Sequence, residues 1–182
     1  SSLSRKQIIG NTKAYNMCDL GAKGFVLARS GQAANIEEYE DEEETAQAEI
    51  FFQALGSDFN WTRHFSAGEA LIQVSISSTL VAACSSRGTL YTFSLGGSLI
   101  STISVPGSVV ALCTFEHLAA VIVSHSLPVD GAQNLTLRLY DLRALSCELL
   151  TSLPLSPGSG LIWAGFGDDG SFVTQDSRGI VR

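Results

Sequence analysis

The stretch EALIQVSISSTLVAACSSRGTLYTFSLGGSLISTISVPG, residues 69–107, contains four apolar runs of strand length separated by short turn signals. The runs are separated or ended by Ser77-Ser78, Arg87-Gly88, Gly96-Gly97 and Pro106-Gly107. Runs of Val, Ile, Leu, Thr and aromatic residues bounded by Gly, Pro and Ser are typical of strands joined by tight turns. The stretch therefore predicts a four-stranded antiparallel sheet.

The same pattern restarts at residue 108 and again near residue 160. Residues 108–155 hold four further runs, and residues 161–182 hold about half of another set. Four strands repeated every roughly 40–50 residues are the signature of β-propeller blades. We therefore expect an all-β chain, a β-propeller fragment of four-stranded antiparallel blades that stops inside a blade.

The predicted strand repeat is less regular before residue 69 than after it. Residues 14–20, 24–30 and 32–40 are expected to be strands, and residues 48–55 a strand or a short helix. The expected organisation is a partial first blade at 1–44 with an acidic loop at 37–44, an irregular or shortened blade at 45–68, blades at 69–106 and 107–159, and a partial blade at 160–182.

Two kinds of strand can be distinguished by their hydrophobic pattern. VVALC (109–113) and LAAVIV (118–123) are continuous apolar runs, which predict strands covered on both faces by neighbouring blades. SLISTIS (98–104) alternates, which predicts an outer strand with one face in water. In the last unit, Trp163 and Phe166 are three positions apart, which is an odd spacing. We expect them on opposite faces, each in the core against a neighbouring blade, with an exposed aromatic anchor for a partner as the alternative.

Charge in this chain is concentrated in one segment. Seven of the eighteen acidic residues lie at 37–44, and the remaining eleven are balanced by eleven basic residues. Without a basic excess, no direct nucleic-acid contact is expected. The acidic run predicts a solvated loop, with a contact to a basic protein surface as the alternative. The longest apolar stretches fall well short of the roughly 18 residues that would span a membrane, so no membrane association is expected.

Candidate catalytic and metal-binding residues are few and poorly spaced. The cysteines are too far apart in sequence for a zinc knuckle and are expected to be reduced, buried thiols. The segment 165–170 matches the glycine-rich dinucleotide pattern but leads into a strand, so it predicts a hairpin turn with Gly170 at positive φ. No histidine pair has helical spacing. We expect no enzyme activity, no cofactor and no metal. The residues considered are Cys18, Cys84, Cys113, Cys147, His64, His117 and His125.

The C-terminal residues carry a resemblance to a known family. The pattern W-x-G-F-x-x-x-G is followed at fixed spacing by D-S-x-G-x-V-R. Together they resemble the SepB-type propeller of the replisome adaptor family that includes acidic nucleoplasmic DNA-binding protein, WD repeat and HMG-box DNA-binding protein, and the yeast chromosome transmission fidelity factor. Two departures are Phe172, where the family usually has proline, and the lack of a full second blade between residues 40 and 66. The matching residues are Trp163, Gly165, Phe166, Gly170, Asp176, Ser177, Gly179, Val181 and Arg182.

The resemblance implies a non-enzymatic function in the nucleus. Members of the family form homotrimers through the propeller and connect the replicative helicase complex to DNA polymerase α–primase, so these proteins are the partners that it implies. A generic WD-type propeller scaffold in another intracellular pathway is the alternative. A propeller hydrolase would need a ring of acids and histidines at the channel mouth, which the sequence does not show.

Overall fold

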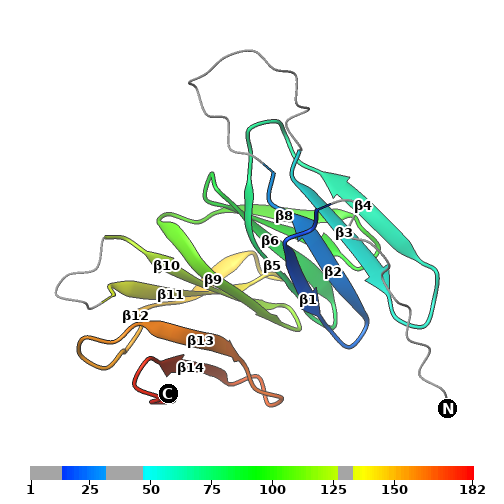
Figure 1. Ribbon diagram of the computed structural model, residues 1–182. Coiled ribbons are helices and arrows are strands. Elements are labelled where there is room, and N and C mark those ends of the chain that lie inside the picture. The colour runs from blue at the N-terminus through cyan, green and yellow to red at the C-terminus, as the bar shows by residue number, and fades with distance from the viewer. Residues whose placement is uncertain (1–13, 32–46, 127–132) are drawn as a thin grey trace, which may run out of the picture.

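The computed structural model describes residues 14–31, 47–126 and 133–182. Within these ranges all regular structure is β-strand, which confirms the expected all-β class, and the strands form antiparallel sheets in chain order (Figure 1). The first sheet contains β1 (Met17–Leu20), β2 (Gly24–Arg29), β3 (Glu49–Ala54) and β4 (Asn60–His64). The second contains β5 (Leu71–Ile76), β6 (Leu80–Ser85), β7 (Thr89–Ser94) and β8 (Leu99–Ser104). The third contains β9 (Ser108–Phe115), β10 (Leu118–Ser124), β11 (Leu135–Asp141) and β12 (Ser146–Ser152), and the fourth contains β13 (Leu161–Phe166) and β14 (Phe172–Asp176).

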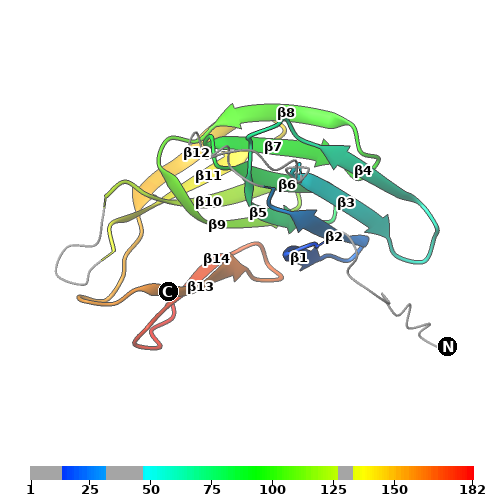
Figure 2. The same cartoon turned by 45° about the horizontal axis from the view of Figure 1, so that its top comes forward.

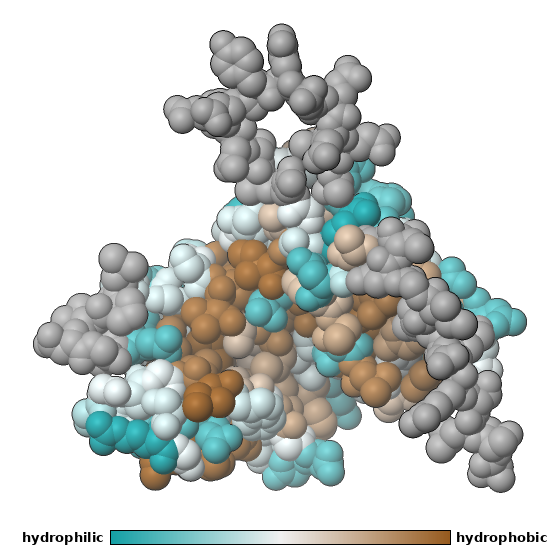
Figure 3. All heavy atoms as spheres, viewed as in Figure 1, coloured by the Kyte–Doolittle hydropathy of each residue, from teal (hydrophilic) through white to brown (hydrophobic). Residues whose placement is uncertain are grey.

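The sheets pack face to face, with the first strand of each at a common inner line. β5 contacts both β1 and β9, and β9 also contacts β13. Figures 1 and 2 show the sheets arranged radially around this line. Hydrophobic residues occupy much of the middle of the face seen in Figure 3, with hydrophilic residues mostly toward its periphery. This arrangement confirms the predicted fragment of a β-propeller.

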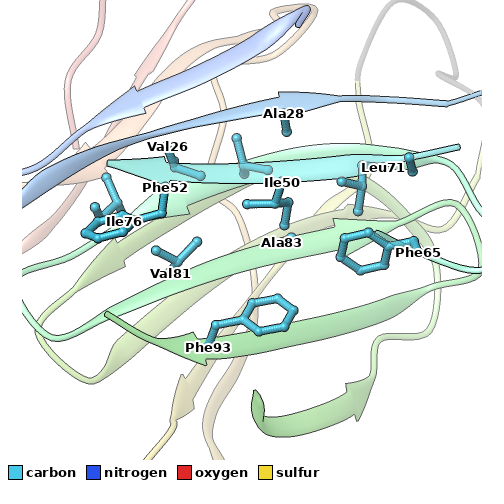
Figure 4. Packing of buried hydrophobic residues seen from close by; sticks show 12 residues of the cluster. Val26, Ala28, Ile50, Phe52, Phe65, Leu71, Ile76, Val81, Ala83 and Phe93 are labelled. Carbon is cyan, nitrogen blue, oxygen red and sulfur yellow. The ribbon is translucent and has the colours of Figure 1, made fainter. Parts of the chain in front are cut away.

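The core consists of three layers of side chains, one between each pair of consecutive sheets. In the first layer, Ile50 and Phe52 of β3 face the second sheet, where Phe93 is buried opposite them (Figure 4). Trp61 lies between Phe52 and Phe93, with ring centroids 5.5 Å and 5.8 Å away. Full burial of an apolar side chain of this size contributes roughly 1.5–3 kcal/mol. These layers therefore hold the sheets together.

Burial is greatest in the second strand of a sheet, not in the first. All residues of β6 are buried, as are Ala119–Val123 of β10, which confirms the prediction for LAAVIV. VVALC in β9 is contacted by the second sheet on one face and the last sheet on the other, as predicted, but it is only partly buried, with Leu112 its one buried residue. The physical reason is position: β9 lies at the inner edge of its sheet, where it has a strand on one side only. β8 is an outer strand as expected, and its Leu99 and Ile100 are exposed.

The first sheet crosses the boundary that the sequence suggested at residue 44. β2 and β3 pair from Gly24↔Ala54 to Arg29↔Glu49, so strands on both sides of that boundary form one sheet. The run at 48–55 is thus a strand. The predicted strand at 32–40 and the acidic loop at 37–44 lie outside the described residues. The long connection between two paired strands hid their relationship, since sequence periodicity reports each strand but not its partner. Each of the ranges 69–106, 107–159 and 160–182 contains one sheet.

The β7–β8 hairpin provides a test of how the first two sheets fit together. Gly97 has φ +86°, and a Cβ there would lie 2.8 Å from Cγ of Trp61. Gly96 has no such restriction, because the atom nearest to a Cβ placed there is the Ser94 hydroxyl oxygen, at 3.6 Å. We expect Gly97→Ala to lower the free energy of unfolding by about 1–3 kcal/mol, through backbone strain and displacement of the indole.

The matched control is Gly96→Ala, expected to change the free energy of unfolding by less than about 0.5 kcal/mol. Urea unfolding followed by tryptophan fluorescence measures both. Equal effects of the two variants would contradict this account of the inter-sheet contact.

Candidate functional site

The first half of the family motif forms an aromatic arrangement on the last sheet. Trp163, Gly165 and Phe166 lie on β13, and Gly170 lies in the turn to β14. A Cβ on Gly165 would lie 2.6 Å from Cζ2 of Trp163, so the glycine makes room for the indole to lie across the strand. Gly170 has φ +80°, as predicted, and a Cβ there would lie 3.0 Å from the ring of Phe115. Both glycines are therefore required for close approach to aromatic rings.

The two aromatic residues of this motif differ in burial. Phe166 packs between sheets, with ring centroids 5.7 Å from Phe115 and 5.3 Å from Phe172. Phe172, which stands where the family usually has proline, thus belongs to the aromatic packing. Trp163 is 49% exposed on the opposite face, so the prediction that it is core was wrong. The odd spacing was sufficient to place the two rings on opposite faces, but it could not show which face another sheet covers.

In the second half of the motif, the turn that follows β14 folds around the buried carboxylate of Asp176. Asp176 Oδ1 accepts hydrogen bonds from the backbone N–H groups of Arg178 and Ile180, at 3.0 Å and 3.1 Å. Asp176 Oδ2 accepts from the Ser156 N–H at 3.1 Å and from Nη1 of Arg182 at 3.0 Å. Hydrogen bonding from Ser156, and then from Arg182 and the Ile180 amide, holds the pKa of Asp176 well below its ordinary value. The carboxylate therefore organises the turn while charged.

The other residues in the second half of the motif also hold the backbone near the turn after β14. Gly179 has φ +77°, which the turn requires. Ser177 exchanges two hydrogen bonds with Gly160: its N–H donates to the Gly160 carbonyl at 2.8 Å, and its hydroxyl accepts from the Gly160 N–H at 3.1 Å. Val181 is exposed and bridges to Gln175 of β14. The structure thus brings the motif together on one sheet, where Asp176, Ser177, Gly179 and Arg182 shape the backbone and Trp163 and Val181 remain accessible.

A polar connection along the inner strands was not found from the sequence. Asp19 Oδ2 on β1 accepts from the Ser75 hydroxyl at 3.0 Å and from the Ile76 N–H at 2.8 Å. The Ser75 hydroxyl lies 2.9 Å from the Thr114 hydroxyl on β9. The first strands of three sheets are therefore linked by side-chain hydrogen bonds. The only available signal was a small polar residue inside each apolar run, which is too common to single out.

A second set of contacts joins the outer strands of the first two sheets. Trp61 Nε1 donates to the Leu95 carbonyl at 2.9 Å. The Arg63 guanidinium donates to the Gly97 carbonyl from Nε at 3.0 Å and from Nη2 at 2.7 Å. Both donors are on β4, and both acceptors belong to the β7–β8 hairpin. Together with the inner connection, these contacts restrict rotation of one sheet against the other.

The histidines and cysteines considered above do not gather into a reaction centre in the structure. Among the described residues, no group of three or more His, Cys, Asp and Glu side chains could hold a metal ion. Burial raises the pKa of Cys84 to about 12 and that of Cys113 to about 11, so both stay protonated. Cys18 and Cys147 are exposed, so the expectation that all four thiols are buried was wrong. No described helix is long and apolar enough to cross a membrane.

Comparison with known families identifies the chain. The family described as "Minichromosome loss protein, Mcl1, middle region" matches residues 1–182, the whole length of the chain. The chain belongs to this family. The match confirms the resemblance drawn from the C-terminal motif.

Relatives in the family are much longer proteins. "Protein ENHANCER OF LHP1 1" of Arabidopsis thaliana is 37% identical over 133 residues, which are 72% of this chain and 14% of that protein. "WD repeat and HMG-box DNA-binding protein 1" of Xenopus laevis is 31% identical over 135 residues, covering 73% of this chain and 12% of that protein. The Homo sapiens protein of the same name is 26% identical over 184 residues, covering 100% of this chain and 16% of that protein. The chain thus spans a small fraction of each relative.

Solved structures with the same fold have little sequence identity to this chain. HIRA(644-1017) aligns with a TM-score of 0.59 at 12% identity, over 92% of this chain and 52% of that one. A chain of the mitotic checkpoint complex aligns with a TM-score of 0.57 at 12% identity, over 89% and 43%. At such identities the likeness establishes the fold alone. It supports the assignment of these sheets as propeller blades.

The stabilising role of the Asp176 carboxylate can be tested by its expected pH dependence. Asp176→Asn removes the charge that Arg182 and three backbone amides contact, so we expect the melting temperature of the protein to fall by several degrees at pH 7. The folded-state pKa of Asp176 is depressed, so the native carboxylate stabilises above its unfolded pKa of about 3.9 and loses that contribution as the pH falls further.

The difference in melting temperature between the two proteins should therefore narrow below about pH 4. Asp168→Asn makes the same charge change at an exposed position of the β13–β14 turn and serves as the control, with little expected effect. Melting curves of Asp176→Asn and Asp168→Asn that coincide at pH 7 would rule out the structural role of Asp176.

Proposed function

We propose that this chain is part of the central propeller of a non-enzymatic adaptor in DNA replication. The proposed adaptor is a nuclear homotrimer that links the replicative helicase complex to DNA polymerase α–primase. The observation that supports it most is the family match over the entire chain, together with relatives named as DNA-binding WD-repeat proteins. The family motif is then mainly a structural element that shapes the last sheet.

The mechanism of such an adaptor is multivalency. Three copies of a peptide-binding arm on one rigid disc convert weak contacts into intramolecular ones, at an effective concentration of roughly millimolar. Rigidity is the property that the blades must supply. Face-to-face packing with hydrogen bonds at both the inner and the outer strands is consistent with that requirement. Helicase and polymerase would then stay together without any single tight interface.

A closed three-fold ring needs heterologous contacts, in which each subunit uses two different surfaces. Those surfaces should be apolar, which fits the low charge of residues 69–182. The acidic run at 37–44 is expected to stay outside the interface, because desolvating seven like charges is costly.

Light scattering of the full-length protein tests the oligomeric state directly, and we expect the mass of three chains. Affinity purification from dividing cells should recover helicase and polymerase α subunits with it. A monomer that recovers neither would rule out the adaptor and would favour the generic propeller scaffold of another pathway. A trimer without these partners would keep the assembly and reject only the link between the two enzymes.

A further inference from the structure

A pocket opens between the first two sheets near the segment that joins them. Its volume is about 310 Å³, and it is lined by β4, by the residues that follow it and by β7–β8. Phe65, Tyr91 and Phe93 supply aromatic rings, and Glu69 supplies a carboxylate. Phe65 and Phe93 point toward one another across the sheets in Figure 4. The pocket is separate from the family motif, which lies on the last sheet.

The aromatic rings meet nearly at right angles. The centroid of Phe65 lies 5.1 Å from that of Tyr91 at an interplanar angle of 75°, and 6.3 Å from that of Phe93 at 89°. Edge-to-face contacts at these centroid distances are direct ring packing, so the three rings form one apolar wall of the pocket beside Glu69. The face of an aromatic ring attracts a cation, because it carries negative partial charge.

The carboxylate in this pocket forms no ion pair with a described residue, although Arg63 and His64 also line the pocket. His64 is directed elsewhere, with Nδ1 3.4 Å from Oε2 of Glu49. Arg63 is directed to the Gly97 carbonyl. Glu69 is 5% exposed, and Oε1 accepts a hydrogen bond from the Tyr91 hydroxyl at 2.8 Å. Burial and the contact with Glu69 raise the pKa of Tyr91, so its hydroxyl remains a donor. A buried carboxylate with one neutral partner is costly and is stabilised by a cationic donor.

The rim of the pocket indicates how such a cation would arrive. Leu99 of β8 lines the pocket and is 54% exposed. Its strand is the outer edge of the second sheet and has no charged residue. An extended segment could therefore lie along this edge, with an apolar side chain against Leu99.

We propose that this pocket binds the side chain of a lysine from an extended segment of a partner protein. The ammonium group donates to Glu69, the aliphatic stem packs against Phe65, Tyr91 and Phe93, and an apolar residue two positions away contacts Leu99. Lysine is favoured over trimethyllysine, because a quaternary ammonium has no N–H to donate to the carboxylate. This inference goes beyond the adaptor function and does not depend on trimer formation.

The test is fluorescence anisotropy with the full-length protein and three labelled pentapeptides. They have the central residue lysine, norleucine or trimethyllysine between two serines, with leucine at both ends, because residues two positions apart in an extended segment share a face. We expect the lysine peptide to bind at least about tenfold more tightly than the norleucine peptide, since the difference is one charge-assisted hydrogen bond. Glu69→Gln should remove that preference, while the Tyr91 hydroxyl can still donate to the amide oxygen.

Glu148→Gln makes the same charge change on an exposed part of β12 and should leave binding of the lysine peptide unchanged. Leu99→Ser is a second variant at an exposed position, which should weaken binding several-fold without affecting the core. Equal binding of the lysine and norleucine peptides would overturn the proposal. So would a lysine preference that survives Glu69→Gln, or binding of the lysine peptide that is unchanged by Leu99→Ser.

Discussion

The requirement to cover the second strand of each sheet on both faces underlies the rest of this structure. β6 is buried throughout and β10 nearly so, and both consist mainly of small and branched apolar residues. Neither strand can face water on either side without losing most of its stabilisation. A single sheet cannot provide this cover, so each sheet serves as the cover of its neighbour. The sheets are consequently stable only as a stack, in which each unit depends on contacts with the next.

Apolar packing alone does not fix how far one sheet turns against the next, since it has little directionality. Hydrogen bonds at the two ends of the sheets supply the missing direction. At the inner side, Asp19 reaches Ser75, and at the outer side Trp61 and Arg63 reach the β7–β8 hairpin. Geometry there is strict, because Gly97 leaves no room between its backbone and the indole. Apolar packing thus holds the two sheets together, and the hydrogen bonds set their relative orientation.

The sequence predicted the fold from residue 69 onward because each strand there is a local pattern ended by a turn signal. It failed where a property depends on pairing or on neighbours: the β2–β3 pairing crosses a long connection, and the exposure of Trp163 depends on which face is covered. The family motif was recognised, but its chemistry was not, because Asp176 contacts Ser156 twenty positions earlier. The pocket at Glu69 was missed for the same reason, since its aromatic residues come from two sheets.

The inner polar connection also has a consequence for how the chain is made. Asp19 and Ser75 are 56 positions apart, and Ser75 and Thr114 are 39 positions apart. Contacts of such long range slow folding, because a large loop must close before they form. During synthesis at about 5–20 residues per second, the partner of Asp19 emerges several seconds after it. The second sheet, which covers the first, ends at Ser104, 40 positions after His64. The first sheet therefore exposes its apolar face for roughly 2–8 seconds, so nascent chains at this stage are natural clients for chaperones.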